Sequence, residues 1–180
     1  MSFRTVYGYV TSENGWRMCN RNECEIVDGP YMETSPLRSG APAIILGDFV
    51  RRYDREVAPV VSSVWGWSST NEVGNSNHLS GTAVDLNAPQ WPWGQYRMPD
   101  DLIARVDALL GWYEGVVFWG RNWDRPDEMH FQIGLAEGDP ALDRIVDKIR
   151  NPAPPKYNPR ADPYVRAGFL QLIPPSRWPQ

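Results

Sequence analysis

The sequence predicts an α+β fold in which helices pack on a small antiparallel sheet. Three stretches carry apolar residues at helical spacing, at 41–57, from about 99 to 111, and at 140–150. Beside them lie short segments with the β-branched and aromatic residues typical of strands, at 60–67, 82–86, 116–120 and 130–134. Helices and strands in one chain of this length indicate a mixed layer architecture.

The clearest helix is expected over residues 41–57. Its apolar side consists of Leu46, Phe49, Val50, Tyr53 and Val57. Charged residues take the opposite side, and Pro59 ends the helix because proline cannot continue it. Before this helix, short strand-like pieces surround the pair Asn14-Gly15, which is a hairpin signal.

The other two helices have start signals in addition to an apolar stripe. The second begins near Pro99 with two aspartates in its first turn, and we expect Gly111 or Gly115 to end it. The third covers residues 140–150 behind the cap residue Asp139.

The chain divides into one domain and a tail. Its 180 residues suit a single domain with a full hydrophobic core, and we place that domain at residues 1–150. From 151 to 180 the sequence is rich in proline, which indicates an extended linker or a tail docked on the domain. We expect the protein to be a monomer.

Composition argues against several classes of protein. The formal net charge of −4 argues against a general nucleic-acid binder. No apolar run reaches the roughly 18 residues that a membrane span needs, so we expect no membrane insertion. The first residues lack the apolar core of a secretory signal. We therefore expect no signal peptide, and a protein that stays in the cytoplasm unless something releases it.

Two short polar motifs contain the only two histidines of the chain. His78 is followed by Asp85 after six intervening residues, and His130 comes just after the acids Asp127 and Glu128. Two imidazoles and one carboxylate make a three-ligand set for zinc, with the fourth position open to water. A nearby acid supplies the general base that hydrolysis needs. We therefore predict a zinc site at the face of the sheet; the alternative is that both histidines are hydrogen-bonded structural residues.

Cys19 and Cys24 are the only cysteines. In a cytoplasmic protein we expect free thiols, or neighbours across a turn. A disulfide formed after release is one alternative. A second zinc site on the pair is less favoured, because both histidines are already assigned.

Nine tryptophans are many for this length. They would line a groove for a glycan or peptide, or pack in the core and its rim, and we favour packing for most of them. Trp119 lies in a predicted strand and is expected in the core. Trp67, Trp91 and Trp93 lie in or beside loops and are the groove candidates.

The two histidine motifs resemble the signature of the zinc peptidases of family M15. The motifs are Ser76-x-His78-x-x-Gly81-x-Ala83-x-Asp85 and Asp127-x-x-His130-Phe131. The stretch from about residue 14 to 133 is similar to the M15 domain of endolysins from actinobacterial phages. The tail lies outside this resemblance.

The resemblance implies a zinc centre with a base beside it. His78, Asp85 and His130 would bind Zn²⁺. Asp127, three positions before the second histidine, would be the general base, and Glu128 is the second choice because it lies one position off.

The resemblance also bears on substrate binding. Ser76 matches a serine that helps to hold substrate or to shape the site, and we add Trp67 from the groove candidates. Ser68 stands where relatives often carry an arginine that polarises the scissile carbonyl. Either another cation replaces that arginine or zinc alone carries the developing charge. The candidate cations are Arg52, Arg121 and Arg125.

The resemblance implies the zinc peptidase of a phage endolysin, acting on the peptidoglycan stem peptide at the L-Ala–D-Glu bond. Such an enzyme would stay in the host cytoplasm until lysis releases it to the cell wall, and a bacterial wall-recycling enzyme is the alternative. A D-Ala-D-Ala carboxypeptidase is the alternative reaction. A non-catalytic wall-binding module with structural zinc is the alternative of a different class, against which Asp127 argues, since a structural site has no use for a base.

Overall fold

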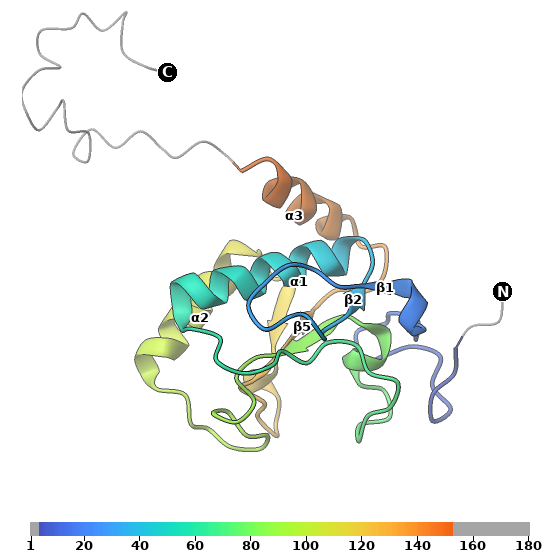
Figure 1. Cartoon of the computed structure of the whole chain (residues 1–180), viewed down its shortest axis with the longest axis horizontal. Coiled ribbons are helices and arrows are strands. Elements are labelled where there is room, and N and C mark those ends of the chain that lie inside the picture. The colour runs from blue at the N-terminus through green and yellow to red at the C-terminus, as the bar shows by residue number, and fades with distance from the viewer. Residues whose placement is uncertain (1–3, 153–180) are drawn as a thin grey trace, which may run out of the picture.

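The computed structural model describes residues 4–152, which form three α-helices and two small antiparallel sheets. The smaller sheet pairs β1 (Cys24–Glu25) with β2 (Leu37–Arg38). The larger sheet has the strand order β3 (Ala83–Asp85), β5 (His130–Ile133), β4 (Val117–Trp119). The predicted mixed fold with helices on a small antiparallel sheet is confirmed (Figure 1).

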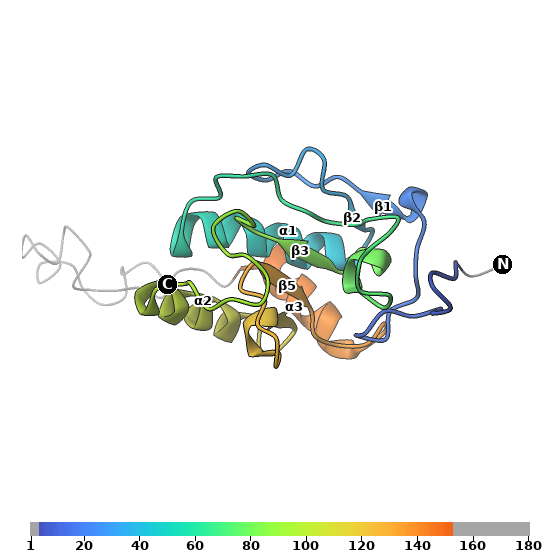
Figure 2. The same ribbon diagram turned by 90° about the horizontal axis from the view of Figure 1, so that it is seen from below.

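The two faces of the larger sheet have different roles, because successive residues of a strand point to opposite faces. Phe131 of β5 packs into the core, with its ring centroid 4.7 Å from that of Phe49 in helix α1 (Ala41–Arg52). Trp119 stacks on Phe131 in this core, which confirms the prediction that Trp119 is a core residue. His130 and Gln132 point to the other face, where His130 contacts Asp85 and Gln132. Figure 2 shows β5 beside α1, with which it is in contact.

All three predicted helices are present. α1 continues as a π-helix, Tyr53–Val57, so the helical stretch covers the predicted 41–57. α2 (Asp100–Trp112) begins right after Pro99, and its last turn contains Gly111, while the chain reverses at Gly115 with φ +84°. α3 (Pro140–Arg150) packs against α1 (Figure 1). As predicted, the Asp139 side chain caps α3 by accepting from the N–H of Ala141 at 2.8 Å.

The strand predicted at 60–67 is wrong. Only Trp65 forms a β-bridge there, to Asp85. The N–H of Val64 instead donates to Tyr31, and that of Trp67 donates to Pro36. Because successive residues bond to different segments, no continuous ladder forms.

The predicted turn at Asn14-Gly15 is present, with Gly15 at φ +82°. Its flanks form one bridge, Thr11 to Arg17, and no hairpin of full strands. The side-chain amide of Asn14 donates hydrogen bonds to the Thr82 hydroxyl and the Ile133 carbonyl. These bonds attach the turn to the larger sheet.

The last helix of the described chain, α3, ends at Arg150. Residues 153–180 of the predicted linker or tail lie outside the described part of the chain. Among the helices between residues 4 and 152, none combines the length and apolar character that crossing a membrane requires.

Candidate metal centre

Three candidate metal-ligand atoms, from His78, Asp85 and His130, meet at the polar face of the sheet. Oδ1 of Asp85 lies 3.2 Å from Nε2 of His78 and 2.9 Å from Nδ1 of His130. The two ring nitrogens are 3.2 Å apart. A tetrahedral ion with bonds of about 2.0–2.1 Å needs donor atoms about 3.3 Å apart. The spacing of this buried triad therefore fits a small tetrahedral metal ion.

The sheet register brings two of these ligands together. Asp85 of β3 and His130 of β5 are direct partners across the two strands. Opposed residues of an antiparallel pair point to the same face with their Cβ atoms about 5 Å apart. The carboxylate and the imidazole are therefore held by the backbone ladder itself.

His78 comes from the 3₁₀ helix Asn77–Ser80, and the loop around it fixes its ring. The Ser76 side chain caps this turn by accepting from the N–H of His78. Nδ1 of His78 lies 2.7 Å from the carbonyl oxygen of Gly66. A carbonyl only accepts, so Nδ1 carries the hydrogen and Nε2 presents its lone pair to the site.

Gly81 ends the same turn in the left-handed conformation, which glycine adopts more readily than other residues. Its φ is +69°, and a Cβ there would lie 2.8 Å from the backbone nitrogen of Arg38. This close approach returns the chain directly into β3. Gly81 thus lets the chain pass close to Arg38 between His78 and Asp85.

Gln132 and Glu13 fix the ring of His130. Oε1 of Gln132 lies 3.0 Å from Nε2 of His130, and Nε2 of Gln132 donates to Glu13 at 2.9 Å. A carboxylate only accepts, so the amide nitrogen must face Glu13 and the amide oxygen must face the ring. Nε2 of His130 then carries the hydrogen, and Nδ1 is free to bind a metal. Asn77 donates to both Glu13 and Gln132, which completes the network.

Gln132 and Glu13 were missed in the sequence. Gln132 stands two residues after His130 in a predicted strand, so the alternation of a strand would have placed both on one face. Nothing in the sequence near Glu13 indicates that it reaches the second motif.

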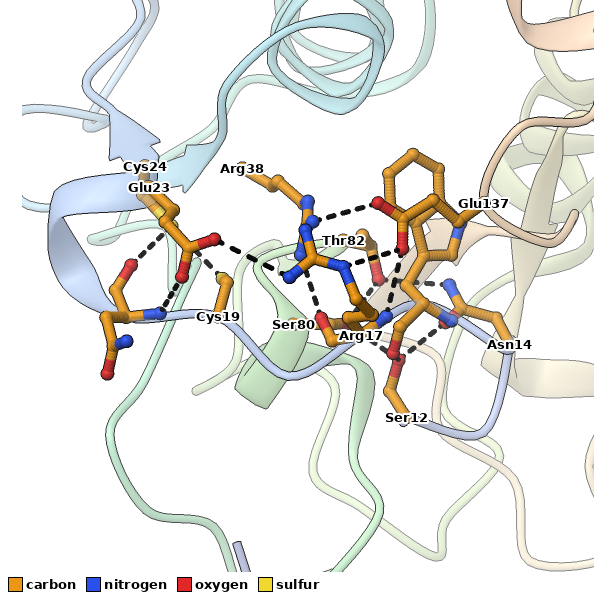
Figure 3. A network of polar contacts seen from close by, with 12 residues as sticks. Ser12, Asn14, Arg17, Cys19, Glu23, Cys24, Arg38, Ser80, Thr82 and Glu137 are labelled. Atoms are coloured by element: carbon orange, nitrogen blue, oxygen red, sulfur yellow. Dashed lines mark hydrogen bonds and ion pairs between the residues drawn. The ribbon is translucent and has the colours of Figure 1, made fainter. Parts of the chain in front are cut away.

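A second polar network ties the N-terminal segment to the loop that carries His78 (Figure 3). The hydroxyl of Ser12 donates to Ser80 at 2.7 Å, and Ser80 lies 2.8 Å from the hydroxyl of Thr82. Arg38 pairs with Glu137 at 2.9 Å beside them. The hydrogen bond between Ser12 and Ser80 thus joins this loop to a segment 68 positions earlier in the chain.

Asp127 is buried and lines the cleft next to the triad. Burial, and then repulsion by Asp85, raise its pKa to about 6, while His130 and His78 act in the opposite direction. Its Oδ1 has no hydrogen-bond partner within residues 4–152. A carboxylate of this kind is ionised at neutral pH and has an oxygen available to accept a proton. Gly120 makes room for it, since a Cβ there would lie 2.9 Å from the Asp127 carbonyl oxygen.

Glu128 points away from the triad into the interior. Its side chain is fully buried, and Oε2 accepts from the backbone N–H groups of Arg97 and Met98 at 2.6 and 2.7 Å. Oε1 lies 3.3 Å from Nε of Arg121. Glu128 therefore anchors the loop that leads into α2, and of the two candidate bases only Asp127 lines the cleft.

Interactions within the triad shift the pKa values of His78 and Asp85 in opposite directions. Burial opposes charge on His78, but the Asp85 carboxylate outweighs it and holds the pKa of His78 above its usual value. The same ion pair, together with His130, holds the pKa of Asp85 below its usual range against the effect of burial. A metal ion binds only a deprotonated imidazole nitrogen, so metal binding competes with protonation of His78.

A cleft of about 1030 Å³ opens over the triad, and tryptophans line it. Trp93, Trp65 and Trp123 are in its wall, with the ring of Trp123 4.9 Å from that of His130. Trp91 packs against the core instead. Trp67 donates from its indole to the Cys19 carbonyl and lines a smaller hollow that also reaches His78 and Asp85. Ser76 lies in the wall of the large cleft.

The three candidate replacements for the arginine expected at Ser68 lie in different surroundings. Arg52 pairs with Asp48 at 2.9 Å and lies outside the cleft. Arg121 pairs with the buried Glu128. Arg125 is the one of the three that lines the cleft.

The two cysteines are free thiols and close neighbours, as predicted. Both are buried, and their Sγ atoms are 3.6 Å apart across the short helical turn Arg21–Glu23.

Residues 69–133 match the family model described as D-alanyl-D-alanine carboxypeptidase. This match supports the M15 peptidase family. The matched segment contains the whole triad and Asp127, so it covers the part of the chain that forms the site. Together, the family match and the triad support a metallopeptidase. Comparisons with curated proteins and with solved structures give no match.

Proposed function

We propose that the protein is a zinc-dependent peptidoglycan peptidase that hydrolyses the stem peptide at the L-Ala–D-Glu bond. The observation that carries the proposal is the buried triad with Asp127 beside it in an open cleft. The family match supports a peptidase acting on peptidoglycan peptides. As the peptidase of a phage endolysin, the protein would stay in the host cytoplasm until lysis.

The donor set suits zinc. Two imidazole nitrogens and one carboxylate oxygen are ligands that catalytic zinc sites use, and they leave one position for water or substrate. Zinc bound there would lower the pKa of a water molecule and polarise the scissile carbonyl. Glu13 and Gln132 would hold His130 in the tautomer that binds.

Asp127 would handle the proton. It would accept a proton from the attacking water and deliver it to the departing amine, which a general base with a pKa of about 6 does well near neutral pH. Trp123 and Trp93 would shield one side of the reacting bond from solvent. A structural zinc site would not require Asp127, so its position favours catalysis over mere wall binding.

The test is Asp127→Asn, assayed on purified peptidoglycan. The variant should lose at least about 100-fold in hydrolysis rate, because it lacks the general base, while zinc analysis shows the metal still bound. Asp107→Asn, on the exposed side of α2, is the matched control and should leave the rate unchanged. Full activity of Asp127→Asn with a bound metal would overturn the assignment of the base. Wall binding without cleavage by the unmodified protein would favour the non-catalytic alternative.

A second reaction is favoured by the description of the matching family, which names a D-alanyl-D-alanine carboxypeptidase. Mass spectrometry of the digest separates the two reactions. New peptides with N-terminal D-Glu support the proposed endopeptidase, whereas released D-alanine supports the carboxypeptidase.

A further inference from the structure

We propose that Arg125 and Trp93 form an anion subsite in the cleft, which binds a carboxylate of the peptide substrate. The inference rests on the proposed function, because the carboxylate is that of the peptide to be cut. It assigns a specificity-determining role to Arg125, separate from the triad and from Asp127.

The charge distribution of the cleft points to this residue. Arg125 is the one lysine or arginine among the described residues that line the cleft. The acids in the same wall are Glu13, Glu72, Asp85, Asp124 and Asp127. A substrate carboxylate would be repelled along most of this wall. Outside the metal site, it would therefore bind at Arg125, the one cationic side chain among the described residues of the wall.

The guanidinium of Arg125 is held by an aromatic ring and keeps its donors available. Its central carbon lies 3.6 Å from the ring centroid of Trp93. No acidic side chain in residues 4–152 lies within ion-pair distance of it. Arg52 and Arg121, by contrast, have their own carboxylate partners. A stacked guanidinium still presents N–H groups in its plane, in the fork geometry that matches a carboxylate.

The loop of Trp93 is shaped to hold this arginine. Gly94 has φ +78°, and a Cβ there would lie 3.0 Å from Nε of Arg125. The N–H of Gly94 donates to the carbonyl of Pro126 at 2.7 Å, which fixes the two loops to each other. The missing side chain thus leaves the space in which the guanidinium lies on the indole. Such preorganisation reduces the entropy lost when a ligand binds.

Two parts of a peptide could supply the carboxylate. One is the free C-terminus of a short peptide, and the other is an acidic side chain within a longer one. Both offer the same two oxygens to the fork of Arg125, so the experiment has one arm for each source.

The experiment compares the zinc-loaded protein with Arg125→Gln on paired peptides. In one pair the C-terminal carboxylate is replaced by a carboxamide, and in the other the side-chain carboxylate is replaced. The unmodified protein should prefer the acid over the amide by about 10–100-fold in kcat/KM in the arm that supplies the ligand, as expected for a charge-assisted hydrogen bond. Arg125→Gln should lose this preference mainly through a higher KM. Arg55→Gln, an arginine exposed on another surface, should retain it.

The outcomes of this experiment separate the inference from the proposed function. An Arg125→Gln protein that retains the full preference for acid would overturn the subsite while leaving the peptidase intact. If the unmodified protein cuts none of the peptides, the proposed function fails. Calorimetric binding of the same uncleaved pairs then decides the subsite: tighter binding of the acid, lost in Arg125→Gln, supports it, and equal binding of acid and amide overturns it.

Discussion

Gln132→Leu should weaken metal binding without removing a metal ligand. Gln132 supplies the one acceptor for Nε2–H of His130 among the described residues and donates to Glu13. Leucine fills a similar volume but has neither group, so nothing fixes which nitrogen of His130 carries the hydrogen. Loss of such a partner typically lowers metal affinity about 10–100-fold. This corresponds to about 1.4–2.7 kcal/mol of binding free energy.

Competition with a chromophoric zinc chelator measures this effect directly. Gln132→Glu keeps an acceptor for His130 but places a second carboxylate beside Glu13, so it should retain most of the zinc affinity while lowering the melting temperature. Gln90→Leu, at an exposed position, serves as the control for the added leucine. A folded Gln132→Leu protein that binds zinc as tightly as the unmodified protein would refute the tautomer argument.

Three further predictions concern stability. In the metal-free protein the pKa of Asp127 is raised from 3.8 to about 6, so its contribution to stability is full below pH 3.8 and is lost as the pH rises to about 6. Asp127→Asn, which mimics the neutral form, should therefore gain on the unmodified protein over this range by up to about 3 kcal/mol in urea denaturation with a chelator. Cys19 and Cys24 should form a disulfide under oxidised glutathione, raising the free energy of unfolding by about 2 kcal/mol, as followed by thiol titration and thermal melting. Gly81→Ala should cost about 1–3 kcal/mol and weaken zinc binding, because a side chain at φ +69° meets the backbone of Arg38.

Each of these expectations has a contrary result. A stability difference for Asp127→Asn that does not change with pH would show that its pKa is ordinary. If both thiols stay reduced under oxidising conditions, the Sγ atoms of Cys19 and Cys24 cannot move from 3.6 Å to bonding distance. If the Gly81→Ala protein keeps the melting temperature and zinc affinity of the unmodified protein, the turn tolerates a side chain.

The sequence predicts best what depends on near neighbours. α3 begins behind Asp139 because that side chain and the following N–H groups lie within one turn. The residue types and spacing of the two histidine motifs predict the triad, and the resemblance adds to that prediction. The structure shows how two of its members meet, since the register of β3 and β5 pairs Asp85 with His130. Which strands pair in which register is a property of the whole sheet.

The sequence predicts least where the partners come from different segments. Asp127 and Glu128 are adjacent acids, yet one lines the cleft and the other binds Arg97 and Met98 in the interior. The loop before α2 supplies the N–H groups that bind Glu128, and the sequence around the two acids does not indicate this partner. Residues 60–67 have strand composition, but their backbone partners are spread over several segments, so the composition alone gives the wrong element.

The bond between Glu13 and Gln132 has a consequence for the order of folding. These residues are 119 positions apart, and the ligands His78 and His130 are 52 apart. Contacts between such distant residues form late, because closing long loops costs entropy before the contacts can repay it. We therefore expect the centre to be among the last parts of the domain to assemble. On this expectation, a chain that is still being synthesised, or one that has partly unfolded, would lack the complete set of candidate metal ligands.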